Sequence, residues 1–134
     1  MIAVDTSALL AIAFGESEAQ AFLDTLIQSD WVLDTPTALE AHIVVARRGS
    51  ASATQALREL LALPRLSLLP FTAAHAFIAR QAYDRYGKGI RHGANLNFGD
   101  CLSYAVAKRD ELPLLFKGHD FSMTDLVPAV TVRP

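Results

Sequence analysis

The sequence predicts an α/β fold in which helices cover both faces of a central, mainly parallel sheet of four to five strands. Short apolar runs alternate along the chain with longer segments whose apolar residues recur at helical spacing, and this alternation is typical of parallel sheets. The chain has no repeat or low-complexity linker, so residues 1–134 are expected to form a single domain. Hydrophobic residues make up 51% of the chain, which is enough for a substantial core.

The first part of the chain is expected to form one strand and two helices. The apolar run at 2–4 (IAV) predicts a short buried strand, and the helix after it, over 7–14, is expected to break near Gly15. Apolar residues recur over 17–27 at the spacing i, i+3, i+4 and i+7. This spacing predicts an amphipathic helix, and Ser17 is its expected N-cap.

The next segment is expected to form a second strand and two more helices. The strand is WVLD at 31–34, and a helix follows it directly because Pro36 is tolerated in a first turn. That helix is expected to end near Gly49, after two arginines that suit a helix C-terminus. Helical spacing returns over 53–61 and is stopped by Pro64.

Two further helices are expected in the second half of the chain. The third strand is predicted at 66–71 (LSLLPF), and Thr72 is expected to cap a long helix that runs to about Tyr86. A glycine-rich loop follows, and Asn97 then caps a helix whose apolar positions lie over 98–106.

The chain closes with a strand, a loop and a candidate fifth strand. PLLFK at 113–117 predicts the fourth strand, 118–126 a loop or turn, and AVTV at 129–132 an edge strand. In parallel α/β folds, ligands bind beyond the carboxyl ends of the strands. Polar residues that directly follow a strand are therefore the first candidates for a site.

Composition and charge narrow the class of protein. The net charge is −2, so a polyanionic substrate would need a metal ion or a local basic patch. The single cysteine, Cys101, excludes an internal disulfide and lies at an expected core position. The sequence has neither a signal-peptide pattern nor a membrane-spanning run, so a cytoplasmic protein without membrane contact is expected. The apolar excess favours a homodimer or another partner.

Four acidic residues stand at unusual positions. Asp5 follows the first predicted strand, and Asp120 lies three residues beyond the fourth. Glu40 interrupts an almost wholly apolar stretch at 37–46 that predicts a buried helix, and Asp100 begins a helix whose body is mostly apolar. A buried carboxylate is costly unless it is paired, protonated or bound to a metal.

Each of these acids also has a purely structural explanation. Asp5 can cap a helix, Asp120 can stabilise a turn, and Asp100 can interact with a helix dipole. Glu40 can pair with a cation such as Arg47. The sequence positions alone leave these alternatives open.

Taken together, the four acids favour a metal site. Carboxylates that gather at one rim of a sheet repel one another unless a cation neutralises them. Oxygen ligands without paired histidines or cysteines suit Mg²⁺ or Mn²⁺, and carboxylate-bound Mg²⁺ typically meets phosphate oxygens. The hypothesis is metal-assisted chemistry on a phosphoryl or phosphodiester group, with Thr6 and Ser7 as hydroxyls that orient Asp5 or a metal-bound water.

Four blocks of sequence resemble one family. They are VDTSALLAI at 4–12, ALEAHIVVARRG at 38–49, NFGDCLSYAVAK at 97–108 and LLFKGHDFSMTD at 114–125. In this order, each with its acid, they are similar to PIN-domain ribonucleases and more narrowly to VapC toxins of VapBC toxin–antitoxin modules.

The resemblance implies a fold, a reaction and partners. It implies a PIN-like three-layer α/β/α sandwich, an endoribonuclease that hydrolyses RNA phosphodiester bonds, a homodimer, and a VapB-like antitoxin that covers the active site. It implies that an acidic pocket binds one or two Mg²⁺ or Mn²⁺ ions. In the resulting hypothesis, Asp5 and Asp100 hold the main ion, Glu40 binds it directly or through water, and Asp120 completes the site or anchors a second ion.

A basic segment is the candidate contact to RNA. Its cations and histidine are Arg80, Arg85, Lys88, Arg91 and His92, and Tyr83 and Tyr86 lie among them as candidates for stacking on bases. The alternative is that the arginines solvate a helix face while the tyrosines pack inward.

Two other functions are compatible with parts of the sequence. One is a phosphatase that uses Asp5 as a nucleophile, although the haloacid-dehalogenase pattern needs a second Asp where this chain has Ser7. The other is a non-catalytic interaction domain, which explains the apolar excess but not four acids at the ends of separate elements.

Overall fold

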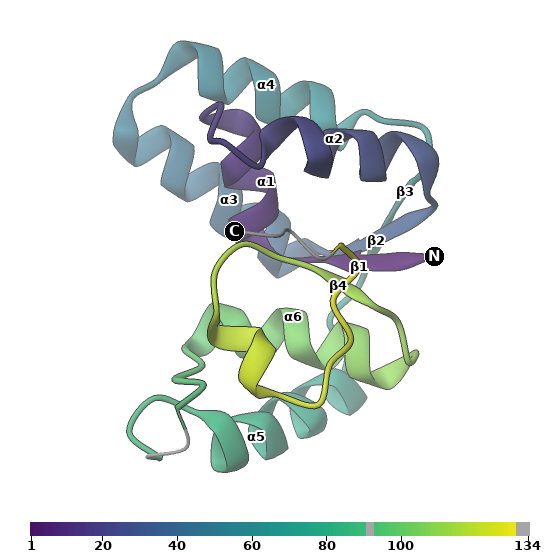
Figure 1. The fold of residues 1–134 in the computed structure, drawn as a ribbon, viewed down its shortest axis with the longest axis vertical. Coiled ribbons are helices and arrows are strands. Elements are labelled where there is room, and N and C mark those ends of the chain that lie inside the picture. The colour runs from purple at the N-terminus through teal and green to yellow at the C-terminus, as the bar shows by residue number, and fades with distance from the viewer. Residues whose placement is uncertain (91–92, 131–134) are drawn as a thin grey trace.

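Four parallel strands form the centre of the molecule, and helices cover both faces of the sheet (Figure 1). The structure is a computed structural model that describes residues 1–90 and 93–130. The strands are β1 (Ile2–Val4), β2 (Trp31–Asp34), β3 (Leu66–Leu69) and β4 (Leu114–Leu115). Their order in the sheet is β3-β2-β1-β4. The predicted α/β fold with a parallel sheet is confirmed.

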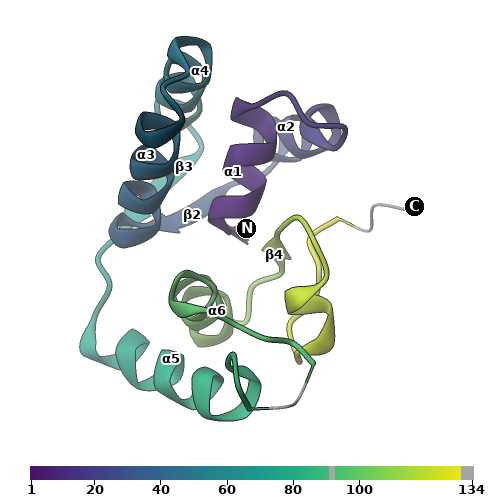
Figure 2. The same cartoon turned by 90° about the vertical axis from the view of Figure 1, so that its left-hand side faces the viewer.

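The helices divide into two layers, one on each face of the sheet (Figures 1 and 2). One layer holds α1 (Thr6–Ala13), α2 (Ala19–Gln28), α3 (Thr35–Arg48) and α4 (Ala51–Leu61). The other holds α5 (Ala73–Tyr86) and α6 (Phe98–Arg109), beside the short 3₁₀ helix η1 (Asp120–Met123). In the described residues, no helix is long and apolar enough to cross a membrane.

Two hydrophobic clusters fill the space between the layers. Successive residues of β1 enter opposite clusters, Ile2 and Val4 on the α1–α4 side and Ala3 on the α5–α6 side, as the two-residue period of a strand requires. Trp31 lies fully buried in the first cluster. Burial of a large apolar side chain of this kind contributes roughly 1.5–3 kcal/mol to folding. Cys101 is buried in the second cluster, and this burial raises the pKa of its thiol to about 11, so the expected core role is confirmed.

The pairing of β1 with its neighbours fixes where the candidate site lies. Val4 stands beside Leu115 of β4, and the backbone N–H of Asp5 donates to the carbonyl of Leu115 at 2.9 Å. The carboxyl ends of β1 and β4 therefore meet at one edge of the sheet, and α1 begins at that edge.

Helix boundaries follow most of the predicted capping residues. Thr72 and Asn97 cap α5 and α6 through their side chains, and Gly49 ends α3 at a φ of 65°, a left-handed conformation that suits glycine. The prediction that Ser17 caps α2 is wrong. Helix α2 begins after Glu18, and the Ser17 hydroxyl donates to the Glu18 carboxylate instead of to the helix.

Helix α3 is not buried on all sides, contrary to the prediction from its apolar sequence. Leu39 is 60% exposed and Ile43 is 47% exposed, whereas Ala41 and Val45 are buried in the core. Helix α3 packs on α1, α4, α6 and β2, and these contacts leave Leu39 and Ile43 exposed. Apolar content by itself does not distinguish a covered face from an open one.

The candidate fifth strand is not formed by the residues that the structure describes. Pro128 makes an isolated parallel bridge with Leu114, and the Ala129 N–H donates to the Leu114 carbonyl at 2.8 Å. The rest of the predicted segment, Thr131 and Val132, lies outside the described residues.

Candidate active site

The four predicted acids come from four different elements and lie at the carboxyl edge of β1 and β4. Asp5 follows β1 and caps α1, Glu40 is in α3, Asp100 is in the first turn of α6, and Asp120 begins η1. Burial and, after it, the charges of the other three acids raise the pKa of Asp100 to about 7, against the lowering effect of the hydrogen bond with the Asn97 backbone. The fold therefore brings all four carboxylates within electrostatic range of one another.

Asp5 is buried and is held through both of its carboxylate oxygens. Oδ2 accepts hydrogen bonds from the Ser7 backbone N–H at 3.0 Å and from the Ser7 hydroxyl at 2.6 Å. Oδ1 accepts a bond of 2.5 Å from the hydroxyl of Ser103 in α6. Burial nevertheless raises the pKa of Asp5, because these hydrogen bonds only partly offset the loss of water. Asp5 is thus both the N-cap of α1 and a member of the acidic group, so its two sequence interpretations are compatible.

Glu40 lies between the start of α1 and the start of α6. The Thr6 hydroxyl donates to Glu40 Oε1. A Cβ placed on Gly99 would come within 2.9 Å of the Glu40 carboxyl carbon, so the carboxylate could keep its present position only beside a glycine and would have to shift beside any other residue. The alternative partner, Arg47, makes no ion pair with Glu40 in the described part of the chain.

Asp100 forms a reciprocal capping pair with Asn97. The Asn97 N–H donates to Asp100 Oδ2 at 3.0 Å, and the Asp100 N–H donates to Asn97 Oδ1 at 2.9 Å. This pair satisfies two backbone donors at the start of α6. The helix-start explanation for Asp100 is therefore correct, and the same residue also faces the acidic group.

The segment after β4 completes this edge of the sheet. The Lys117 backbone N–H donates to the Ser7 hydroxyl at 3.0 Å, which orients that hydroxyl toward Asp5. The Lys117 side chain pairs with Glu16 and, at 3.3 Å, with Glu18. Asp120 is exposed at the start of η1 and is the most accessible of the four acids.

The donor set fits a hard divalent cation. It consists of carboxylate and hydroxyl oxygens. Burial is the main cause of the raised pKa of Asp100, but the charges of Asp5, Asp120 and Glu40 also raise it, and a cation would offset this repulsion. Among residues 1–90 and 93–130, no three acidic, histidine or cysteine side chains stand ready to ligate one ion together. Three of the four carboxylates instead accept hydrogen bonds, from Thr6, Ser7, Ser103 and the Asn97 backbone.

Sequence reasoning missed two residues that shape the site, Ser103 and Gly99. Ser103 lies three residues after Asp100, which places both on one side of α6, and this spacing was the available signal. Gly99 directly precedes Asp100, but its contact with Glu40 joins two segments that are far apart in the sequence. No local pattern reports such a contact.

The predicted basic segment is not one surface in the residues that the structure describes. Arg80 pairs with Asp84 on an exposed face of α5, and the Arg85 guanidinium stacks over the Tyr86 ring at 4.8 Å. The Lys88 carbonyl accepts a bond from the Tyr83 hydroxyl at 3.2 Å.

One part of this RNA-contact prediction is wrong, and another part concerns residues outside those that the structure describes. Tyr86 is only 2% exposed, so its suggested stacking on a base is wrong. Tyr83 remains exposed. Arg91 and His92 lie outside the described residues.

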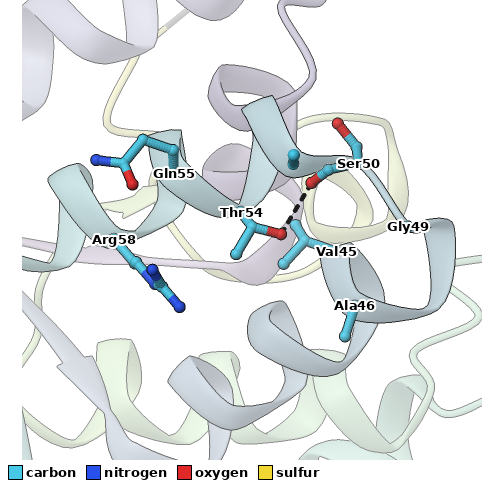
Figure 3. A pocket seen from close by; sticks show the side chains of 8 residues that line it. Val45, Ala46, Gly49, Ser50, Thr54, Gln55 and Arg58 are labelled. Atoms are coloured by element: carbon cyan, nitrogen blue, oxygen red, sulfur yellow. Dashed lines mark hydrogen bonds between the residues drawn. The ribbon is translucent and has the colours of Figure 1, made fainter.

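A cavity of about 380 Å³ lies between α3 and α4, away from the acids (Figure 3). Its wall includes Val45, Gly49, Thr54 and Arg58, and the Thr54 hydroxyl donates back to the Ser50 carbonyl at 2.8 Å. The cavity has one cationic and no acidic side chain in its lining. It therefore contributes nothing to the acidic group.

Comparisons with known proteins agree with this geometry. The family model described as "PIN domain" matches residues 2–126. Ribonuclease VapC28 of Mycobacterium tuberculosis is 41% identical over 131 residues, which cover 97% of this chain and 98% of that protein.

Two solved structures have the same fold. The crystal structure of VapC20 of Mycobacterium tuberculosis, described as a sarcin–ricin loop cleaving toxin, superposes with a TM-score of 0.73 at 22% identity over 100% of both chains. A toxin–antitoxin complex from Klebsiella pneumoniae gives a TM-score of 0.67 at 19% identity over 91% of both chains. With the family match and the close relative, these findings show that the chain belongs to the PIN-domain family and, within it, to the VapC ribonucleases.

Proposed function

We propose that this protein is a divalent-metal-dependent endoribonuclease in which Asp5, Glu40, Asp100 and Asp120 form the catalytic and metal-binding group. The observation that carries the proposal is the convergence of these four acids, from four elements, at the carboxyl edge of the sheet. Mg²⁺ or Mn²⁺, when bound, would offset phosphate charge and acidify a water molecule for attack on the RNA phosphodiester.

The surrounding side chains hold the acids in place. Ser7 and Ser103 donate to both oxygens of Asp5, so the orientation of this carboxylate is fixed. Thr6 fixes Glu40, and Gly99 leaves room for it beside Asp100. In the proposed mechanism, Asp5 and Asp100 are the main ligands, Glu40 binds directly or through water, and Asp120 completes the site.

The geometry disfavours Asp5 as a phosphatase nucleophile. Asp5 is only 4% exposed, and both of its oxygens accept hydrogen bonds. A nucleophilic carboxylate must present one oxygen to the substrate. A stable phosphoaspartate at Asp5 would contradict this conclusion.

We further propose that residues 1–134 act as one domain, as the toxin of a VapBC module. A VapB-like antitoxin and a second copy of the chain are its proposed partners. The neighbouring Klebsiella pneumoniae structure is a toxin–antitoxin complex, and the exposed Leu39 and Ile43 of α3 support contact with some partner.

Cleavage of RNA by the purified protein, freed of any co-expressed partner, tests the function. The assay compares Mg²⁺, Mn²⁺ and EDTA for the parent, Asp5→Asn and Asp100→Asn, with Asp24→Asn as the control because Asp24 is an exposed acid on α2. Cleavage that needs metal and is lost only in the two site variants supports the proposal. Equal cleavage by Asp5→Asn and the parent would refute the assigned site.

A further inference from the structure

A second cavity, of about 530 Å³, lies between α5 and α6. Gln81 and Arg85 line it from α5, Tyr104, Lys108 and Arg109 line it from α6, and Asp125 lines it from the segment after η1. Of its four charged residues, three are cations, in a chain whose net charge is −2.

The single carboxylate of this cavity is already engaged. Asp125 accepts hydrogen bonds of 2.7 Å from both the Lys108 ammonium and the Tyr104 hydroxyl. Burial works against ionisation of Asp125, but these two donors outweigh it and lower the pKa of the carboxyl. Asp125 therefore neutralises Lys108 and no other cation of the cavity.

Arg85 and Arg109 have no carboxylate within ion-pair distance among the residues that the structure describes. The Arg85 guanidinium lies over the Tyr86 ring. Asp125 raises the pKa of Lys108, and the charge of Arg85 opposes this rise. Helix dipoles favour cations in the last turns of α5 and α6, where these residues lie. The dipoles do not explain why cations from two helices face one another across a cavity, since like charges repel.

Two segments of the chain, helix α6 and the C-terminal segment after β4, run from the acidic site to the cavity. Along α6, Asp100 and Lys108 are eight residues apart, about 12 Å at the helical rise of about 1.5 Å per residue. Along the C-terminal segment, Asp120 lies near Asp100, and Asp125 is bonded to Lys108. A stacked strand that rises about 3.4 Å per nucleotide covers 12 Å in roughly three to four nucleotides.

We propose that Arg85 and Arg109, which face one another across this cavity, form a binding site for a backbone phosphate of the RNA substrate, roughly three to four nucleotides from the bond that is cut. The inference rests on the proposed function, which supplies RNA as the substrate. Two arginines offer planar donors that pair with phosphate oxygens, and the anion relieves the repulsion among the cations. The site also compensates for the acidic edge, which repels RNA.

The test is the salt dependence of RNA binding, measured in EDTA, where the proposed cleavage does not proceed. Fluorescence anisotropy follows short labelled single strands of mixed sequence. Arg85→Gln with Arg109→Gln should lower the magnitude of the slope of log K against log salt by about 1.4, because each lost phosphate contact on a single strand removes about 0.7. Arg85→Lys with Arg109→Lys keeps the charge and should keep the slope, which separates charge loss from misfolding.

Arg47→Gln with Arg58→Gln is the matched control, because it removes the same charge from α3 and α4. An unchanged slope in this control supports the proposal, and an equal fall in both double variants would overturn it. The inference, but not the proposed function, would be overturned by two results together. The parent would cleave RNA with metal, and the variant Arg85→Gln with Arg109→Gln would bind RNA with the same slope of log K against log salt as the parent. A parent that neither binds nor cleaves RNA would overturn both.

Pyrophosphate distinguishes RNA from a free phosphate ligand at the same cavity. Its binding, followed by calorimetry, is expected to be weak in the parent. Tight pyrophosphate binding that disappears in Arg85→Gln with Arg109→Gln, together with an unchanged RNA slope, would assign the cavity to a free phosphate compound and overturn the inference.

Discussion

The hydroxyl of Ser103 donates a hydrogen bond of 2.5 Å to Oδ1 of Asp5, although 98 positions separate the two residues in the chain. Ser103 is buried in α6 and Asp5 is buried at the end of β1. The bond ties the helix that carries Asp100 to the strand that carries Asp5. The distance between these two acids is therefore set by packing in the core rather than by a flexible loop.

Ser103→Ala should lower cleavage activity without abolishing it. Loss of a partner that orients a ligand typically costs 10- to 100-fold in metal affinity or activity, and a similar loss of cleavage rate is expected here, roughly 10- to 100-fold. The unpaired Asp5 oxygen should also reduce the free energy of unfolding by about 1–3 kcal/mol. Rates and urea unfolding are measured beside Ser52→Ala, an exposed change on α4. Parent-like rates for Ser103→Ala would show that this bond does not orient Asp5.

Thr6→Val should reduce activity because it removes the hydroxyl that donates to Glu40 while keeping the shape of the side chain. A loss of roughly 10- to 100-fold is expected for an orienting partner of a ligand. Thr6→Ser restores the hydroxyl and should recover most of the rate. If Val and Ser variants cleave equally, the hydroxyl has no role in holding Glu40.

Gly99→Ala should destabilise the protein only while Glu40 is present. The added Cβ would come within 2.9 Å of the Glu40 carboxyl carbon, so the carboxylate or α6 must move. Alanine is otherwise favoured over glycine in a helix by roughly 0.5–1 kcal/mol. In a Glu40→Ala background, Gly99→Ala should therefore be neutral or stabilising.

A double-mutant cycle of unfolding free energies measures this coupling between Gly99 and Glu40. Additive effects of the two substitutions would mean that Gly99 and Glu40 do not compete for space.

The metal-free protein should become more stable as the pH falls from about 7 toward 4. Burial and then the neighbouring charges raise the pKa of Asp100 from 3.8 to about 7, so in this interval the folded state binds a proton that the unfolded state does not. Lowering the pH increases the free energy of unfolding wherever the folded state binds more protons than the unfolded state. The raised pKa of Asp5, caused by its burial, acts in the same direction.

Urea unfolding in EDTA at several pH values checks this dependence, with Asp100→Asn as the comparison. The variant lacks the Asp100 carboxyl and should show a weaker dependence on pH. Mg²⁺ should stabilise the parent most near neutral pH, where the carboxylates are ionised. A pH profile that is identical in parent and Asp100→Asn would remove Asp100 as a source of the effect.

The order of strands and helices was predictable because each element has its own local signal. Apolar runs mark β1, β2 and β4, and helical spacing with Thr72 and Asn97 as caps marks α5 and α6. Ser17 shows the limit of such signals, because a serine before a helix pattern can bond to another neighbour and leave the cap position empty.

Two acids outside the candidate site have structural roles that the sequence did not single out. Asp34 is 2% exposed and caps α3, with bonds of 2.8 Å from the backbone N–H and the hydroxyl of Thr37. Asp125 holds the C-terminal segment against α6 through Lys108 and Tyr104. In the sequence these two acids look no different from exposed ones, because burial depends on what packs against them.

The element order, the parallel sheet and the four acids of the candidate site could all be predicted from patterns along the chain. Each of these follows from residues within one or two turns of chain, whose periodicity and capping chemistry are local. The contacts of Ser103 with Asp5 and of Gly99 with Glu40 exist only in the folded chain and could not be predicted from the sequence. The same holds for the cavity that Arg85 shares with Lys108 and Arg109 rather than with Lys88. These contacts form when the helices pack against the sheet and bring together residues that are far apart in the sequence. The packing is driven by burial of apolar surface over the whole core, so no local pattern reveals it.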